Sequence, residues 1–164
     1  MIVRLTMAAA ALALMAAPAL AQDYSQDPTY GTLNVTTGFI PDPAVIPVIA
    51  GGGIDASSLG GGCVGYIADA PDFRLNYVAG TDFPLIISAL GEMDTTLVVN
   101  AADGSWHCND DSDELNPAIT FASPASGQYD IWVGTYDPAA TGMAGLYISE
   151  VTTGAQSAGG MSDH

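Results

Sequence analysis

No lysine occurs in this sequence of 164 residues, and its strong bases are limited to Arg4 and Arg74. Against them stand eighteen Asp and Glu residues, and the formal net charge is −16. A chain this acidic repels phosphate backbones and anionic membrane surfaces, which excludes nucleic acid as a partner. The absence of lysine also excludes a Schiff-base mechanism. The partners that this charge permits are cations, basic proteins and neutral polymers.

Long apolar runs are also missing after the N-terminus, where no stretch approaches the roughly 20 residues that a membrane-spanning helix needs. The segment 1–21 combines Arg4, an apolar stretch over 7–17 and the small-residue site Ala19-Leu20-Ala21. This order is typical of a cleaved signal peptide, so we expect export to the periplasm or the medium and no transmembrane anchor. Cleavage would leave eighteen carboxylates against one arginine, a formal charge of −17.

Cysteine is scarce as well, with Cys63 and Cys108 as the available pair. Two cysteines in an exported chain most often form a disulfide, so the sequence predicts a Cys63–Cys108 bridge. A zinc site that uses Cys63, His107 and Cys108 is the alternative. It is disfavoured because adjacent side chains on an extended segment point to opposite sides, and because no second spaced pair of ligands occurs.

A convincing helix pattern is absent from the sequence that follows the predicted signal peptide. From Cys63 onward, short β-patterned runs recur at the spacing of a sandwich. These runs are 64–68, 73–78, 83–90, 95–100, 118–122, 128–136 and 145–151. The run 73–78 alternates apolar with polar side chains, and the preceding Asp72 falls on its polar, solvent-facing side. The pattern predicts an all-β, antiparallel, jelly-roll-like β-sandwich in a single domain.

Composition divides the chain into further segments. Residues 22–62 are rich in Gly and Pro and are expected to be mostly loop, with one strand near 32–37 and an edge strand at 45–50 that contains Pro47. Residues 63–151 form the predicted β-sandwich domain. Residues 152–164 are rich in Gly, Ser and Ala without an apolar period, and this composition predicts a disordered tail.

The sequence offers no complete catalytic constellation. His107 is the one histidine expected inside the fold, and no Gly-x-Ser-x-Gly or Gly-Asp-Ser-Gly-Gly stretch accompanies it. Paired carboxylates could act on glycosides, but a clustered acidic loop does not place an acid and its ionised partner across a cleft. A catalytic role is therefore disfavoured.

The segment 94–114 is strongly acidic and contains neither Lys nor Arg. Its carboxylates repel one another at neutral pH unless solvent or a metal ion compensates them. Calcium accepts six to eight oxygen ligands in irregular geometry and suits such a set. A helix-loop-helix calcium hand is excluded, since Cys108 stands where that motif needs glycine. The segment thus predicts either a Ca²⁺ site on β-loops or a solvated acidic surface.

Several short motifs occur in a fixed order in the second half. They are Asp94-Thr95-Thr96-Leu97, Asp103-Gly104, Asn109-Asp110-Asp111, Asn116-Pro117-Ala118-Ile119 and Gly127-Gln128-Tyr129-Asp130-Ile131-Trp132-Val133-Gly134. In this order they resemble the bacterial pre-peptidase C-terminal (PPC) domain, a small β-sandwich attached to secreted proteases and related to clostridial collagen-binding domains. The resemblance covers about 85–151.

The resemblance implies a jelly-roll fold and, as in calcium-binding members of the family, an ion near the acidic turns. The matching positions are Asp94, Asp103, Asn109, Asp110 and Asp111. Two departures limit what carries over. The family usually accompanies a catalytic domain, which this sequence does not contain, and the Gly-rich first half with Cys63 is not part of the usual pattern. Collagen binding is therefore not transferred.

Together these observations favour an exported, non-catalytic module that binds an extracellular or envelope protein or polysaccharide and is stabilised by calcium. The candidate aromatic contacts are Trp106, Trp132, Tyr136 and Tyr147. Trp132 alternates with Tyr129 and Ile131 and so faces the other side of its strand. There Trp132 and Tyr136 either pack in the core or rim, the commoner outcome, or present an aromatic surface to the ligand. The alternative is a small secreted peptidase, or an accessory protein associated with one. A purely structural role in the envelope or matrix stays open as well.

Overall fold

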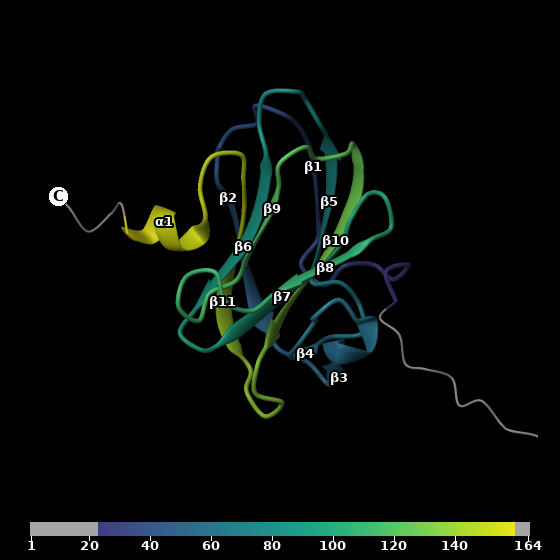
Figure 1. The fold of residues 1–164 in the computed structure, drawn as a ribbon, viewed down its shortest axis with the longest axis vertical. Coiled ribbons are helices and arrows are strands. Elements are labelled where there is room, and N and C mark those ends of the chain that lie inside the picture. Colours follow the sequence, from purple (N-terminus) through teal and green to yellow (C-terminus); the bar gives the residue numbers. More distant parts are fainter. Residues whose placement is uncertain (1–22, 160–164) are drawn as a thin grey trace, which may run out of the picture.

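Two β-sheets packed face to face form the part of the chain that the computed structural model describes, residues 23–159 (Figure 1). The predicted all-β sandwich in a single domain is thereby confirmed. The predicted signal peptide, 1–21, lies outside the described residues. Over 23–159 no helix has the length and apolar character needed to cross a membrane.

The larger sheet, sheet A, has β10 (Gly127–Thr135) at its centre. β5 (Phe73–Val78) pairs along one edge of β10 and β7 (Thr95–Asn100) along the other. The outer neighbours are β1 (Thr32–Thr36) beside β5 and β8 (Trp106–Asn109) beside β7. β4 (Tyr66–Ile67) pairs with the C-terminal end of β10 and with β3 (Ile54–Asp55). β1 runs parallel to β5, an exception to the antiparallel arrangement expected from the sequence.

The smaller sheet, sheet B, has the strand order β2 (Ala44–Ala50), β11 (Gly142–Ser149), β6 (Leu85–Gly91) and β9 (Ala118–Phe121). Pro47 lies in the edge strand β2, as predicted. An edge strand tolerates proline because no strand pairs with its outer side, so the hydrogen bond of the missing N–H is not required there.

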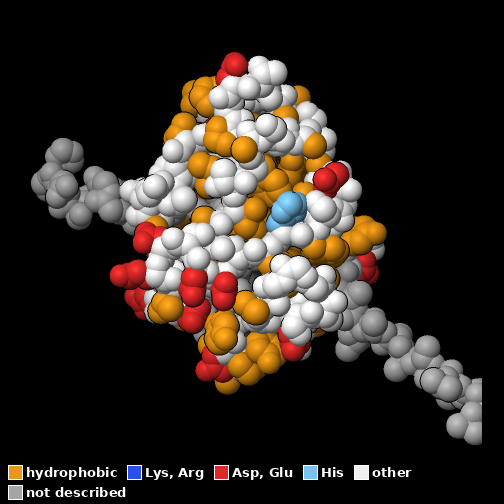
Figure 2. All heavy atoms as spheres, viewed as in Figure 1, with side chains coloured by type: hydrophobic (Ala, Val, Ile, Leu, Met, Phe, Trp, Pro, Cys, Tyr) orange, Lys and Arg blue, Asp and Glu red, His pale blue; other side chains and the backbone are white. Residues whose placement is uncertain are grey.

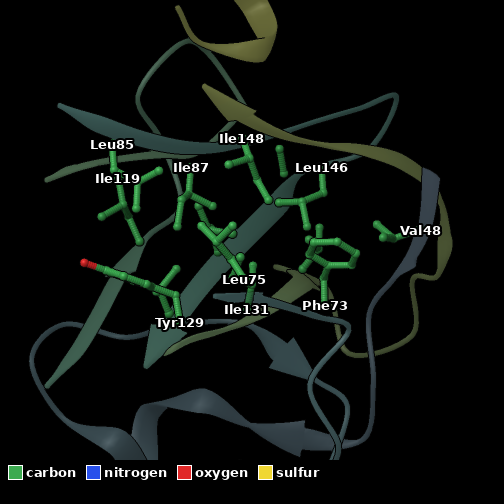
Figure 3. Close-up of a cluster of buried hydrophobic side chains, with 14 of the residues drawn as sticks. Val48, Phe73, Leu75, Leu85, Ile87, Ile119, Tyr129, Ile131, Leu146 and Ile148 are labelled. Carbon is green, nitrogen blue, oxygen red and sulfur yellow. The ribbon is translucent and has the colours of Figure 1, made fainter. Parts of the chain in front are cut away.

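The main core lies between the sheets (Figure 3). Sheet A contributes Leu75 and Ile131, while sheet B contributes Ile87 and Leu146, and none of these four side chains is exposed. Alternate residues of each strand point inward, so the period of two read from run 73–78 is confirmed by the burial of Phe73, Leu75 and Tyr77.

A second, smaller cluster lies on the outer face of sheet A, under the segment 54–68, which we call the cover. The cover consists of β3, the 3-10 helix η1 (Ala56–Leu59) and β4. Its Ala56 and Ile67 pack against Val98 of β7 and Trp132 of β10. The predicted disulfide is confirmed: Cys63 of the cover is bonded to Cys108 of β8, with a Cα–Cα distance of 5.0 Å.

Two predictions about chain organisation need correction. The segment 106–109 was not predicted as a strand, yet it forms β8 at the edge of sheet A. Within the predicted disordered tail 152–164, Gly154–Gly159 forms the short helix α1, and residues 160–164 lie outside the described residues. The N–H of Gly154 donates to the Ser88 hydroxyl at 2.8 Å, which attaches the start of α1 to β6.

Candidate cation site and binding surfaces

The β7–β8 hairpin separates the acidic residues into two groups. Leu97 lies opposite Asn109 near the open end of the hairpin. Asp94, just before β7, and Asp110–Asp111, just after β8, therefore share that open end. Asp103 lies in the turn at the closed end, about 20 Å away at about 3.3 Å per residue of strand. The register thus places three of the predicted ligands at the same end of the hairpin and leaves Asp103 apart.

The shared open end has an unusual carboxylate. The Asp94 Oδ1 atom is buried and has no hydrogen-bond partner in the described part of the chain. Burial raises the pKa of Asp94, and the neighbouring carboxylates of Asp111 and Asp110 raise it further. A cation would relieve both effects, because it would pair the buried oxygen and offset the mutual repulsion. We refer to Asp94, Asp110 and Asp111 as the acidic end.

The other two predicted ligands are already engaged within the protein. Asn109 Oδ1 accepts hydrogen bonds from the Ser112 hydroxyl at 2.8 Å and from the Ala118 N–H at 3.0 Å, which fixes the β8–β9 loop. Asp103 accepts from the hydroxyl and the N–H of Ser105, and these bonds lower the pKa of Asp103. As placed, no three His, Cys, Asp or Glu side chains of residues 23–159 stand close enough together to hold a metal ion.

Acidic side chains nevertheless gather on one flank of the molecule. Figure 2 shows Asp and Glu atoms concentrated at the lower left of the view, with no Lys or Arg side chain visible on that face. The local potential there is negative and suits a cation or a basic partner.

His107 does not belong to a catalytic triad. Its Nε2 atom lies 2.8 Å from the Ser105 hydroxyl oxygen, but that hydroxyl donates its proton to Asp103. In a serine hydrolase the serine would instead give its proton to the histidine, and the acid would orient the far ring nitrogen. The His107 ring packs edge-on against Phe121 with centroids 4.9 Å apart. The zinc alternative also fails, since both cysteine sulfurs are bonded to each other.

The four predicted aromatic contacts occupy different environments. Trp132 is fully buried, so of its two predicted alternatives the packed one holds and this side chain cannot contact a ligand. The cover packs on this face of β10 and encloses the ring. Trp106 is half-buried and stacks on Trp132 at 5.4 Å, while the Tyr136 side chain is 55% exposed. Tyr147 is half-buried on the outer face of sheet B.

That outer face of sheet B carries exposed apolar side chains. A groove of about 810 Å³ runs across the strands β2, β11 and β6. Its wall contains the exposed side chains of Val45 and Met143, which are 53% and 63% exposed. The backbone of Gly145 forms part of its floor between Pro47 and Leu90, its neighbours in the two flanking strands. We call this feature the sheet B groove.

Sequence reasoning missed the sheet B groove, although a signal was present. In Ala44–Ala50 both alternate sets of side chains are apolar, so a strand with one face on the core must expose the other set. The exposed set consists of Val45, Pro47 and Ile49. An edge strand with apolar residues on both faces therefore predicts an interaction surface.

Neither a known protein family nor any curated protein matches this sequence. Among solved structures, the chain is similar to the pre-peptidase C-terminal domain of a collagenase from Bacillus anthracis, with 16% sequence identity and a TM-score of 0.39 over 72% of this chain and 92% of that one. It is also similar to a periplasmic inhibitor of g-type lysozyme from Aeromonas hydrophila, with 16% identity and a TM-score of 0.37 over 73% of this chain and 96% of that one. The first of these is a domain of the kind that the sequence motifs resemble.

Proposed function

We propose that this chain is an exported, non-catalytic β-sandwich module that binds a basic protein through the sheet B groove and is stabilised by Ca²⁺ at the acidic end. The sheet B groove is the observation that carries the proposal. Export is supported by the disulfide, because such bonds persist in oxidising compartments outside the cytoplasm.

The groove supports a protein partner because of its size and its exposed side chains. Val45 and Met143 of the groove are 53% and 63% exposed, and Ile49, opposite Met143 in the ladder, is 44% exposed. Contiguous apolar surface of this kind commonly marks an interface in a soluble domain. Methionine adapts its shape to a partner, which favours Met143 as a contact residue.

Charge indicates which partner the groove accepts. The chain has a formal net charge of −16, and the single Arg74 of the described residues is paired with Asp130 at 2.6 Å. A second copy of this chain would carry the same charge and be repelled. A basic protein with an apolar segment can pack that segment in the groove, while its positive charge is attracted by the negative charge of this chain.

Placing a carboxylate in the groove tests this function. We expect Met143→Glu and Val45→Glu to weaken retention of the partner by about tenfold or more, because a charge buried at an interface without a counter-charge is costly. The measurement compares proteins from the host's periplasmic and secreted fractions that are retained by immobilised wild type and by each variant, quantified by mass spectrometry.

Ser123→Glu is the matched control, because it adds the same charge at an exposed site in the loop between β9 and β10. A basic protein retained by wild type and by Ser123→Glu, and lost with both groove variants, supports the proposal. Equal retention by all three variants would remove the groove as the binding surface. Sedimentation velocity of the free protein checks that the groove is not closed by self-association.

The calcium part of the proposal rests on the buried, unpartnered Asp94 oxygen and its two acidic neighbours. An ion that binds the folded state alone raises its stability by about 2.7 kcal/mol at a hundredfold excess over Kd. We therefore expect the thermal midpoint to rise with CaCl₂ relative to EDTA, and to rise much less with MgCl₂, which demands stricter octahedral geometry.

Two isosteric variants locate the ion. Asp111→Asn removes a charge at the acidic end and should abolish most of the calcium-dependent rise in midpoint. Asp103→Asn removes a charge at the far end of the same hairpin and should leave the rise intact. Loss of the rise in Asp103→Asn as well would indicate a larger site that includes the turn, and no rise in wild type at millimolar calcium would refute the ion.

A further inference from the structure

The outer face of sheet A is divided into a covered half and an open half. The cover packs over Val98 and Trp132 at one end of β7 and β10. At the other end of β10 the face is open and hollowed, with a depression of about 580 Å³ bounded by β1, β5 and the start of β10. Gly127 lines this depression at the start of β10.

Three side-chain amides line up across this depression. Asn34 of β1 lies opposite Asn76 of β5, which lies opposite Gln128 of β10. Neighbouring strands are about 4.8 Å apart, so the amides form a row perpendicular to the strands. All three residues lie on the outward-facing side, and Asn34 and Gln128 are exposed. We call them the amide row.

Hydrogen bonds orient the amide row and leave part of it unused. Asn76 Nδ2 donates to Asn34 Oδ1 at 2.8 Å, and Gln128 Nε2 donates to Asp130 Oδ2 at 2.7 Å. Among the described residues no side chain or backbone group takes up the Asn34 Nδ2, the Asn76 Oδ1 or the Gln128 Oε1 atom. The row therefore presents one donor, Asn34 Nδ2, and two acceptors, Asn76 Oδ1 and Gln128 Oε1.

The row is electrically neutral, although the protein as a whole is acidic. The carboxylate that accepts from Gln128, that of Asp130, is buried and paired with the Arg74 guanidinium. The Arg74 Nη2 atom donates to the carbonyls of Tyr24 and Gln26, so two of the three guanidinium nitrogens are engaged within the protein. The net negative charge of the protein repels anionic ligands. It does not repel neutral ligands.

Apolar surface completes the depression. Val78 is 53% exposed beside the row. A sugar ring offers hydroxyl groups that both donate and accept, together with C–H faces that pack on aliphatic side chains. A protein interface would instead need buried aromatic or arginine anchors, and the depression contains an aromatic ring only as the buried Tyr77.

We propose that the amide row, Asn34, Asn76 and Gln128, binds a neutral polysaccharide chain laid across β1, β5 and β10. This site goes beyond the protein-binding function proposed above, because it uses the opposite sheet. Polysaccharide hydroxyls bond to the free amide atoms, and the C–H face of a sugar packs against Val78.

Affinity electrophoresis in native gels tests the site. The probes are dextran, a soluble mixed-linkage β-glucan and galactomannan as neutral polymers, with alginate as the anionic one. We expect at least one neutral polymer to retard the oxidised wild-type protein and alginate not to retard it. Asn34→Ala and Gln128→Ala should each weaken retardation about tenfold, since each removes one or more hydrogen bonds to the sugar.

Thr120→Ala is the matched control, an exposed polar side chain on β9 of the opposite sheet. It should leave retardation unchanged. Thermal midpoints of all variants establish that they fold, which is expected because both row positions are exposed. Retardation by none of the neutral polymers, retardation by alginate alone, or unchanged retardation in Asn34→Ala and Gln128→Ala would each overturn the proposal. None of these outcomes bears on retention of a protein by the sheet B groove.

Discussion

Replacement of Asp72 by Asn is expected to raise the free energy of unfolding at pH 8 by up to about 4 kcal/mol. Asp72 precedes β5, is 3% exposed, and accepts a hydrogen bond from the Val133 N–H at 2.7 Å. Burial raises the pKa of Asp72 to about 7 from its ordinary value of 3.8, although the Val133 hydrogen bond acts in the opposite direction. Asparagine keeps a carbonyl oxygen for Val133 and carries no charge.

The pH dependence follows from the direction of this shift. Below pH 3.8 the Asp72 carboxyl is protonated in both the folded and the unfolded chain and has no differential effect. Between pH 3.8 and about 7 the folded state holds its proton while the unfolded state releases it, so stability falls as the pH rises. Above about pH 7 the loss is complete. Asp72→Asn removes this contribution and should diverge from wild type through that window.

Urea unfolding of wild type and Asp72→Asn at intervals from pH 4 to 8.5 measures the effect. The two free energies should be close at pH 4 and separate steadily toward pH 7.5. Asp82→Asn serves as the control, because Asp82 is exposed in the β5–β6 loop and the change should leave the profile parallel to that of wild type. Parallel profiles for Asp72→Asn and wild type would contradict a raised pKa at Asp72.

Asp72 also illustrates where sequence reasoning fails. The alternation in 73–78 correctly predicted which side chains of β5 face the core. It also placed Asp72 on the solvent-facing side of the strand. In the structure, however, the backbone of Asp72 is hydrogen-bonded to the backbone of Tyr30 and Ile131, and its side chain is buried. A period of two identifies the face of a strand, but it does not reveal whether a distant segment lies on that face.

Trp132 shows the same limit on the neighbouring strand. Its position on β10 was predicted, and so was its orientation opposite Tyr129 and Ile131. Its burial depends on the cover, which lies more than 60 residues earlier in the sequence. The cover contains short strands and a single 3-10 turn, and its Gly-rich sequence gives little periodic signal.

The candidate sites, too, were predictable from the sequence only in part. The acidic segment was recognised from composition, but only the β7–β8 register separates Asp103 from the acidic end. The amide row requires the parallel pairing of β1 with β5, since a shift of one residue would turn Asn34 into the core. Pairing partners and register depend on contacts between distant segments, and local sequence patterns do not encode them.

Removal of the disulfide is expected to lower the free energy of unfolding by about 4 kcal/mol. The Cys63–Cys108 bond joins residues 45 apart in sequence, and closing a loop of that length restricts the unfolded chain. In the folded protein it also ties the cover to β8. The cover is otherwise held to the sheet by the short β3–β4–β10 pairing and by the packing of Ala56 and Ile67.

Both tryptophans of the chain report on this region. Trp132 lies under the cover, and the half-buried Trp106 stacks on it at 5.4 Å. In Cys63→Ser/Cys108→Ser we expect the tryptophan emission in native buffer to shift to longer wavelength, because a loosened cover admits water to Trp132. Wild type treated with dithiothreitol should show the same shift, which separates loss of the bond from effects of the serine side chains.

The comparison of two probes during urea unfolding then locates the stabilisation. Far-UV circular dichroism follows both sheets, whereas tryptophan emission follows the cover and the strands beneath it. If the bond acts mainly on the unfolded chain, both midpoints should fall together by the equivalent of about 4 kcal/mol. An emission midpoint that falls further would place part of the effect in local opening of the cover. Unchanged midpoints and unchanged emission in both reduced forms would refute the prediction, since strand pairing and apolar packing would then suffice to keep the cover on Trp132.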